Sequence, residues 1–372
     1  MKKFIYIVCM VITCNLLTVP VCAENKDNSV SIIGESAIVR EVETGDILYE
    51  KNIDTERYPA SITKIMTALV VLDNRELEDE VTFTEEALSS IESGSSAAYI
   101  KPGETLTVEQ SLYIMMLHSA NDVAHGLAYE VGGDLNGFAN LMNKKAAELG
   151  CTKTHFVNAS GLTEENHYTT ANDMSKIARE AYKNKILLRI METAKYELSA
   201  TNKCNEPRSW TNGNRMIRKG SEYFYEPCLG GKTGYTVAAG GTLVTYAKIK
   251  DTILECVVLK SQNSATAYED SIKLYKYLEK NQDFSVYKEK EEEPTVQDTT
   301  LETEKEPENI IYDKTETPLE KAISLVKIAV FVLIILCVGV ILRILYVQRQ
   351  RRKRRKAMKK RRQQKNGTRK RR

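Results

Sequence analysis

The chain is organised around one stretch, Tyr58-Pro59-Ala60-Ser61-Ile62-Thr63-Lys64-Ile65-Met66-Thr67-Ala68-Leu69. Apolar residues at positions 62, 65, 66, 69 and 70 have the spacing of an amphipathic helix, and Pro59 favours a helix start. Ser61 is therefore expected in the first turn, with Lys64 one turn further along the same side. If burial or a neighbouring cation lowers the lysine pKa, its amine can serve as the base for a serine nucleophile.

The Ser-x-x-Lys spacing is weak evidence when it stands alone. It recurs at Ser285 and Lys288 and again at Ser324 and Lys327. A solvated lysine on a helix face gives the same spacing without any chemistry. A catalytic interpretation therefore needs partner residues elsewhere in the chain.

Both ends of the 372-residue chain have patterns that are typical of targeting segments. Residues 1–23 combine two early lysines, an apolar run and the small residue Ala23, which predicts a secretory signal peptide. Residues 328–342 are uncharged and almost wholly apolar, and 323–347 is long enough to predict a transmembrane helix if Lys327 and Arg343 snorkel. The segment 348–372 carries 16 Lys or Arg and no acid, so the positive-inside rule predicts a cytoplasmic tail. We therefore expect a single-pass protein of the cell membrane with its main body outside the cytoplasm.

The formal net charge of +3 hides an asymmetry, because without the 16 tail positives residues 1–348 carry a net charge of −13. An exported body this acidic is not expected to bind nucleic acid. The basic tail is expected to contact anionic lipid headgroups, with a nucleic-acid or protein partner as the alternative.

Residues 288–322 separate the body from the predicted span. Positions 288–320 hold 12 acids, 4 bases and three prolines, with little apolar content. Such a composition predicts a disordered, self-repelling linker and not a second domain. One globular domain is therefore expected at residues 24–287.

Four cysteines fall in this predicted domain, at positions 151, 204, 228 and 256. Export permits disulfides, but four cysteines allow three complete pairings, and the sequence does not select among them. Neither these cysteines nor the four histidines have the spacing of a metal site. No metal and no other cofactor are therefore predicted.

The predicted domain mixes helices with antiparallel strands. Residues 36–40 and 46–50 have the pattern of a hairpin, and a capping box at 107–110 begins an apolar helix. Further helices are expected at 122–133, 135–149 and 171–183, and again at 265–279. From residue 194 the pattern changes to strands, including 230–236, 242–249 and 252–259. The expected fold class is α+β, with an antiparallel sheet flanked by helices and a helical lobe formed mainly by residues 61–185.

Two further motifs follow Ser61 in chain order. Ser119-Ala120-Asn121 is expected in a short connection between helices, and Lys232-Thr233-Gly234 on a strand. Ser-x-Asn recurs at 261–263, whereas Lys-Thr-Gly occurs once. The three elements in this order are typical of penicillin-binding proteins and β-lactamases.

The chain resembles the penicillin-binding proteins of low molecular weight, and most closely the serine D-alanyl-D-alanine carboxypeptidases of peptidase family S11. The resemblance also rests on the stretches 58–67, 117–122, 154–162 and 231–236, and it covers about residues 30–280. It implies the penicillin-recognising serine hydrolase fold, which is β-lactamase/transpeptidase-like and agrees with the α+β pattern. It further implies peptidoglycan stem peptides and β-lactams as partners.

The resemblance implies a role for each residue of the first two motifs. Ser61 would be the acylated nucleophile, and Lys64 its general base. Ser119 would relay a proton to the leaving group. Asn121 would hold the peptide part of the substrate.

The third motif would bind the substrate. Lys232 would lower the pKa of Lys64 by its charge and, with Thr233, bind the terminal carboxylate. Gly234 would give clearance for the strand to approach the substrate. The backbone amide of Tyr235 would complete an oxyanion hole with that of the nucleophile.

Other polar residues of the segment 154–173 are expected to have structural roles. His167 and Asp173 match family positions, where we expect a satisfied loop histidine and a helix-capping aspartate. Glu164 and Glu165 lie in the region where a class A β-lactamase carries the glutamate that activates its deacylating water, but the surrounding pattern is missing.

The predicted function is a serine D-Ala-D-Ala carboxypeptidase that removes the terminal D-alanine from stem peptides through an acyl-enzyme on Ser61. One alternative is a class A-like β-lactamase, whose Ser-Asp-Asn motif this chain lacks at 119–121. The other is a membrane-bound penicillin-binding receptor, although a long disordered linker transmits strain poorly. Release of D-alanine excludes the receptor, and slow release of bound penicillin excludes the β-lactamase.

Overall fold

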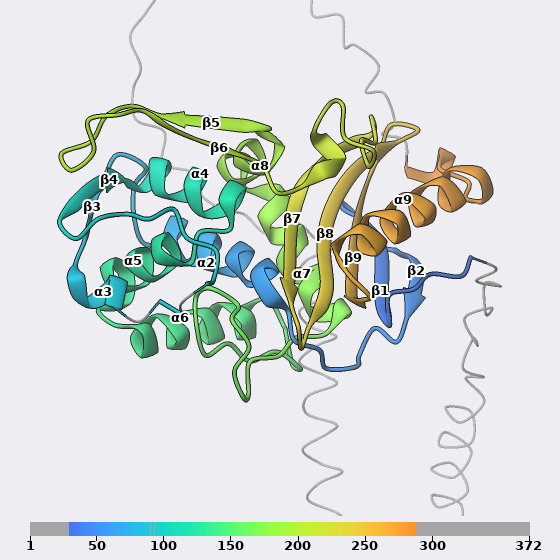
Figure 1. The fold of residues 1–372 in the computed structure, drawn as a ribbon. Coiled ribbons are helices and arrows are strands. Elements are labelled where there is room, and N and C mark those ends of the chain that lie inside the picture. The colour runs from blue at the N-terminus through green and yellow to red at the C-terminus, as the bar shows by residue number, and fades with distance from the viewer. Residues whose placement is uncertain (1–29, 90, 93, 288–372) are drawn as a thin grey trace, which may run out of the picture. The chain divides into compact units, whose positions relative to one another are not determined.

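The computed structural model describes residues 30–89, 91–92 and 94–287 (Figure 1). The predicted signal peptide, linker, span and tail at 1–23 and 288–372 lie outside the described residues. Within the described part, no helix combines the length and the apolar character needed to cross a membrane.

A five-stranded antiparallel sheet has the strand order β2-β1-β9-β8-β7. Its strands are β1 (Ser36–Glu41), β2 (Ile47–Lys51), β7 (Cys228–Thr236), β8 (Gly240–Ile249) and β9 (Thr252–Ser261). The hairpins expected at 36–50 and 242–259 are both present. Lys250 and Asp251 form the second turn with φ of 49° and 69°, the left-handed backbone of a two-residue hairpin turn.

Both faces of this sheet are buried, because successive side chains of a strand point to opposite sides. On β9, Cys256 and Val258 belong to the core beneath α9 (Ser264–Asn281), and Val257 and Leu259 to the core shared with the helical lobe. The helices α7 (Ala171–Lys183) and α8 (Lys185–Glu192) contact the lobe-side face (Figure 1). The expected sheet flanked by helices is thus confirmed.

The helical lobe is built around α2 (Thr63–Leu72), in which every residue from Thr63 to Val71 is buried. Its neighbours are α4 (Val108–His118), α5 (Asn121–Gly132) and α6 (Leu135–Glu148). The predicted capping box at 107–110 is present at the start of α4. A helix that is buried all round belongs to the centre of a core, so any polar side chain on α2 must find its partners inside the lobe.

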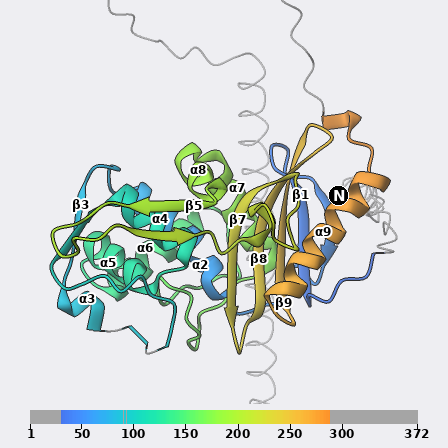
Figure 2. The same ribbon diagram turned by 45° about the horizontal axis from the view of Figure 1, so that its top comes forward.

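Two small sheets and the short helix α3 are the remaining strands and α-helix of the described part. β3 (Glu80–Phe83) pairs with β4 (Glu104–Thr107), and α3 (Glu85–Ser89) lies between them in the chain. β5 (Lys195–Leu198) and β6 (Arg208–Thr211) form a ribbon across α4, where Tyr196 stacks on Tyr113 with ring centroids 4.4 Å apart (Figure 2). The sequence predicts strands from 194 onward but misses β3, β4, α3 and α8.

The four cysteines of the domain are free thiols, with Cys204 half-buried and the other three buried. The structure thus forms none of the three pairings that the sequence left open. Among the described residues, no group of three or more metal-ligating side chains is assembled.

Candidate active site

Ser61 lies in a 3-10 turn, η1 (Ala60–Ile62), that leads directly into α2. The sequence places it in the first turn of the α-helix itself, one element later. Ala60 has a φ of 52°, a left-handed conformation that costs a non-glycine residue about 1–2 kcal/mol. A hydrogen bond ties the turn to β8, because the Thr242 hydroxyl donates to the Pro59 carbonyl at 2.8 Å. The nucleophile candidate is therefore presented on a strained, firmly packed turn.

The Lys64 side chain is fully buried, and its amine contacts three oxygens. Nζ lies 3.2 Å from Ser61 Oγ, 2.7 Å from Asn121 Oδ1 and 2.6 Å from the Ser160 carbonyl. The amine thus joins α2 to the start of α5 and to the loop before α7.

The three contacts fix the direction of the Lys64 lone pair. A carbonyl and an amide oxygen can only accept, so Ser160 and Asn121 each take one N–H. A neutral amine has two N–H donors and one lone pair, and that lone pair then faces the Ser61 hydroxyl. Because Lys64 must donate, the oxygen of the Asn121 amide faces it, and the NH₂ group is turned away.

Burial lowers the pKa of Lys64 well below its ordinary value, and the charge of Lys232 lowers it further, against a smaller opposing effect of Asp122. Burial also lowers the pKa of Lys232, to about 7. The charge of Lys232 thus favours the neutral form of the Lys64 amine, which is the form that can accept a proton.

Lys232 on β7 reaches the second motif. Its Nζ donates to Ser119 Oγ at 2.8 Å and to the Thr233 carbonyl at 2.8 Å. Ser119 is the C-cap of α4 with a φ of 61°. Asn121 is the first residue of α5 and not part of the connection, because α5 begins one residue earlier than expected. Since Ser119 Oγ accepts from Lys232, its own hydrogen can point to another acceptor.

Gly234 is required by the turn that carries the nucleophile. A Cβ at this position would lie 2.7 Å from Ser61 N and 2.4 Å from Thr242 Oγ1. From the sequence, Gly234 is expected to leave room for the substrate. In the structure, its missing side chain leaves room for η1 and β8 instead. The next residue, Tyr235, is 54% exposed.

The predicted site residues are thus brought together from three parts of the chain. Ser61 and Lys64 come from η1 and α2, Ser119 and Asn121 from the α4–α5 junction, and the third motif from β7. The last group consists of Lys232, Thr233, Gly234 and Tyr235.

The Ser160 carbonyl is a part of the site that motif reasoning missed. Asn158 Oδ1 accepts from Gly161 N at 2.7 Å and from Ser160 Oγ at 3.2 Å, and its Nδ2 donates to the Leu162 carbonyl at 3.0 Å. Gly161 has a φ of 85° and packs against Ala60 with no room for a side chain. The turn residues Asn158 and Gly161 were the signal available in the sequence.

His167 has structural partners as expected, whereas Asp173 is not the helix cap that the sequence predicts, because Thr170 caps α7. Val157 N donates to His167 Nδ1 at 3.1 Å, so Nε2 carries the proton and donates to Thr63 Oγ1 at 3.0 Å. Burial lowers the pKa of this histidine to about 3. Asp173 accepts from Lys153 N at 2.7 Å in the first turn of α7.

Comparison with known proteins gives consistent relatives. Over 219 residues the chain is 36% identical to D-alanyl-D-alanine carboxypeptidase DacF of Bacillus subtilis, covering 58% of this chain and 54% of that protein. It is 31% identical over 247 residues to a D-alanyl-D-alanine endopeptidase of Pseudomonas aeruginosa, covering 66% and 77%. The match to DacF thus spans about half of that relative's length.

A solved structure has the same fold. The Streptomyces K15 DD-transpeptidase matches with a TM-score of 0.63 and 30% identity, covering 67% of this chain and 97% of that chain. The α+β fold with a five-stranded antiparallel sheet is therefore that of this DD-transpeptidase. The family model described as D-alanyl-D-alanine carboxypeptidase matches residues 23–263. With this match and the relatives above, the chain belongs to the peptidase S11 family of D-alanyl-D-alanine carboxypeptidases.

Proposed function

We propose that this chain is a serine D-Ala-D-Ala carboxypeptidase that removes the terminal D-alanine from peptidoglycan stem peptides. The observation that carries the proposal is the buried Lys64 amine, 3.2 Å from Ser61 Oγ, with its other two contacts occupied by acceptors. The direct test is incubation of the full chain in detergent with a pentapeptide ending in D-Ala-D-Ala. Free D-alanine should accumulate with turnover.

The geometry supports a two-step acyl transfer. The Lys64 lone pair takes the Ser61 proton while Oγ bonds to the carbonyl carbon of the penultimate D-alanine. The carbonyl oxygen becomes an oxyanion, stabilised by the amides of Ser61 and Tyr235. The C–N bond then breaks as the nitrogen of the terminal D-alanine receives a proton through Ser119. Water finally hydrolyses the ester and restores the serine hydroxyl.

Lys232 and Thr233 support the choice of a carboxypeptidase over an internal peptidase. Together they supply an ammonium and a hydroxyl on β7, two residues and one residue before the glycine that packs on the nucleophile turn. A carboxylate one residue beyond the scissile bond suits that pair. If the substrate ended in a neutral amide instead, the Lys232 ammonium would lose its water without gaining a counter-charge.

Amidation of the terminal D-alanine should therefore reduce kcat/KM by roughly a hundredfold, the effect of leaving a buried charged group unpaired. Lys232→Ala should remove most of the difference between acid and amide and should be slow on both, since Lys232 also lowers the pKa of Lys64. Steady-state kinetics on the two peptides measure both effects. Equal cleavage of acid and amide by the unaltered chain would favour an endopeptidase, the activity named for the Pseudomonas aeruginosa relative.

β-Lactams are proposed to acylate Ser61 by the same step, with the opened ring remaining attached. The class A β-lactamase alternative receives little support from the loop before α7. Glu164, one of its two candidate acids, accepts from Asn158 Nδ2 at 2.7 Å and so helps to hold the turn that presents Ser160. Slow release of a bound penicillin is expected.

We also propose that residues 323–347 anchor the domain to the cell membrane, with the tail at 348–372 in the cytoplasm. The support is the apolar run followed by 16 positive charges. Protease added to intact cells should degrade the domain and spare an epitope on the tail, as detected by immunoblotting. A degraded tail together with an intact domain would show that the chain has the opposite orientation.

A further inference from the structure

Asp122 is the second residue of α5 and directly follows the second motif. Its side chain is 1% exposed. Within the described residues, its carboxylate accepts from Ala98 N at 2.9 Å, from Ile100 N at 3.1 Å and from Val123 N at 3.0 Å. An ionised carboxylate has acceptors and no donor, so these N–H contacts all suit the charged form. Asp122 is therefore a buried anion that joins the start of α5 to the loop before β4.

The loop 96–100 is also bonded to the second motif directly. Asn121 N donates to the Ser96 carbonyl at 2.8 Å, and Ser96 Oγ donates to the His118 carbonyl at 2.8 Å. Asn121 is thus held by the loop at its backbone N–H and by Lys64 at its side-chain oxygen. A displacement of this loop would therefore move the amide oxygen that helps to orient the Lys64 lone pair.

Tyr99 shows that the backbone of this loop is held against a local preference. It lies between the two loop residues that donate to Asp122, and its φ of 60° is left-handed, which is unfavourable for a bulky side chain. Its ring is 83% exposed, so burial of the ring does not explain this conformation. Strained backbone persists where the surrounding structure over-determines it. The two hydrogen bonds to Asp122, on either side of Tyr99, supply that constraint.

The same carboxylate acts on the base by its charge. Burial lowers the pKa of Lys64 most and the charge of Lys232 lowers it further, whereas Asp122 raises it. The histidines close enough to interact with Lys64 are neutral at pH 7, because burial lowers the pKa of His125 to about 4 and that of His167 to about 3. In the described part of the chain, Asp122 is thus the anion that opposes the effects of burial and of Lys232.

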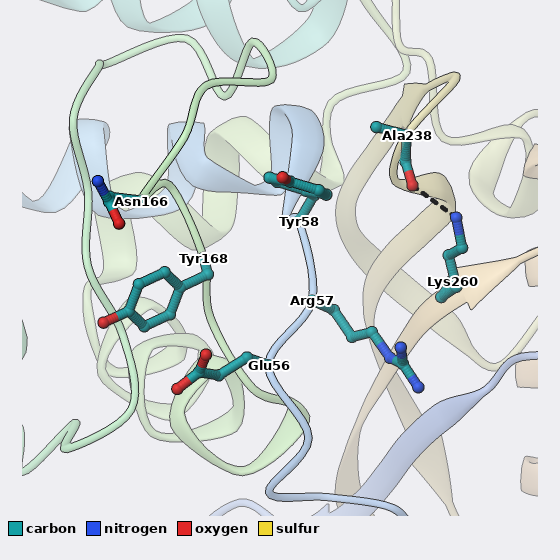
Figure 3. Close-up of a pocket in the computed structure, with 7 residues that line it drawn as sticks. All are labelled: Glu56, Arg57, Tyr58, Asn166, Tyr168, Ala238 and Lys260. Carbon is teal, nitrogen blue, oxygen red and sulfur yellow. Dashed lines mark hydrogen bonds between the residues drawn. The ribbon is translucent and has the colours of Figure 1, made fainter.

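A carboxylate near the nucleophile in the sequence does not share this role. A cavity of about 410 Å³ is lined in part by Glu56 and Tyr58, just before the nucleophile turn (Figure 3). Glu56 is exposed, and the charges that shift the pKa of Lys64 do not include it. Nearness to Ser61 along the chain is therefore not sufficient for a carboxylate to act on the base.

We propose that Asp122 is a positioning residue for the acylation of Ser61, which holds the loop 96–100 so that Asn121 keeps its side-chain oxygen at the Lys64 amine. Its negative charge also keeps this amine basic enough to take the serine proton, since a weaker base accepts a proton less readily. This inference rests on the proposed function, and it adds to it a residue that acts through Asn121 and Lys64.

Asp122→Asn removes the charge and replaces one acceptor oxygen by an NH₂ group, which leaves an N–H group of the loop without its acceptor. Acylation of the full chain in detergent by a fluorescent penicillin is followed by stopped flow as a function of pH. The maximal rate should fall by about tenfold, a part of the 10²–10⁴-fold that a positioned general base contributes. The decline of the rate at low pH should move to lower pH, because loss of the charge lowers the pKa of Lys64 further. A residue that only stabilises the fold would not move this decline.

Two control variants remove a carboxylate elsewhere. Asp134→Asn does so at the start of α6, where Asp134 accepts from Gly137 N at 2.6 Å, and Glu56→Gln does so before the nucleophile turn. Both should keep the low-pH decline of the unaltered chain. Asp122→Ser removes the charge with a smaller side chain and should shift the decline in the same direction as Asp122→Asn. Thermal unfolding curves verify that each variant is folded.

The outcomes separate this inference from the proposed function. If the low-pH decline stays in place in the Asp122 variants, the inference is overturned and the proposed function stands. A shift of equal size in the two controls also overturns it, as does failure of both Asp122 variants to fold while the controls fold. Absence of acylation and of D-alanine release in the unaltered chain overturns the proposed function itself.

Discussion

Penicillin should form one covalent adduct per chain, located on Ser61, and Ser61→Ala should lose it together with the release of D-alanine. The expected loss of turnover is at least about a thousandfold, because no other group can take over the attack on the carbonyl. The reason lies in the geometry, since Ser61 Oγ is the hydroxyl that the Lys64 amine contacts. Intact-protein mass spectrometry and peptide mapping after incubation with benzylpenicillin measure the adduct.

Ser285→Ala is the matched control for this experiment. Ser285 has the same Ser-x-x-Lys spacing in the sequence but lies in η3 (Ser285–Tyr287), a short turn without buried residues. This variant should acylate like the unaltered chain. Mapping of the adduct to any serine other than Ser61 would refute the assigned nucleophile.

Lys64→Met should slow acylation of Ser61 by roughly a thousandfold, within the 10²–10⁴ range that a positioned general base contributes. Methionine fills the same buried space without an amine, and a thermal unfolding curve verifies that the domain remains folded. Stopped-flow measurement of acylation by a fluorescent penicillin gives the rate. Lys144→Met, at an exposed lysine of α6, is the control and should leave the rate unchanged.

The pH profile distinguishes a base from a structural lysine at position 64. Acylation should fall as the pH drops through the lowered pKa of Lys64, because the protonated amine has no lone pair to accept the serine proton. It should also fall as the pH rises through the pKa of Lys232, about 7, because the carboxylate-binding charge is lost. Lys64→Met should lose the acid limb alone. An acid limb that persists in this variant would exclude Lys64 as the base.

Much of the fold could be predicted because its signals are local. The hairpin at 36–50, the capping box at 107–110 and the helix at 171–183 are each specified by neighbouring residues. α8 was missed because a single residue separates it from α7: Asn184 ends one helix, and its side chain caps the next. Such a short break does not interrupt the helical pattern.

The site residues could be named from motifs, whereas the arrangement around them could not. The Ser160 carbonyl is a backbone group, and motifs specify side chains. Its position depends on the turn held by Asn158 and on the packing of Gly161 against Ala60. Likewise, Gly234 meets the nucleophile turn across a separation of more than 170 residues in the sequence, a contact that no local pattern specifies.

The position of β7 at the end of the sheet has a consequence for self-association. Among the described strands it has a partner on one side alone, and an unpaired strand edge is a template for pairing with another chain. β7 carries three glycines, at 230, 231 and 234. Glycine weakens a strand because its backbone loses much conformational entropy on folding and it has no side chain to pack. The residues that let β7 approach the nucleophile turn therefore also make its open edge a poor template for aggregation.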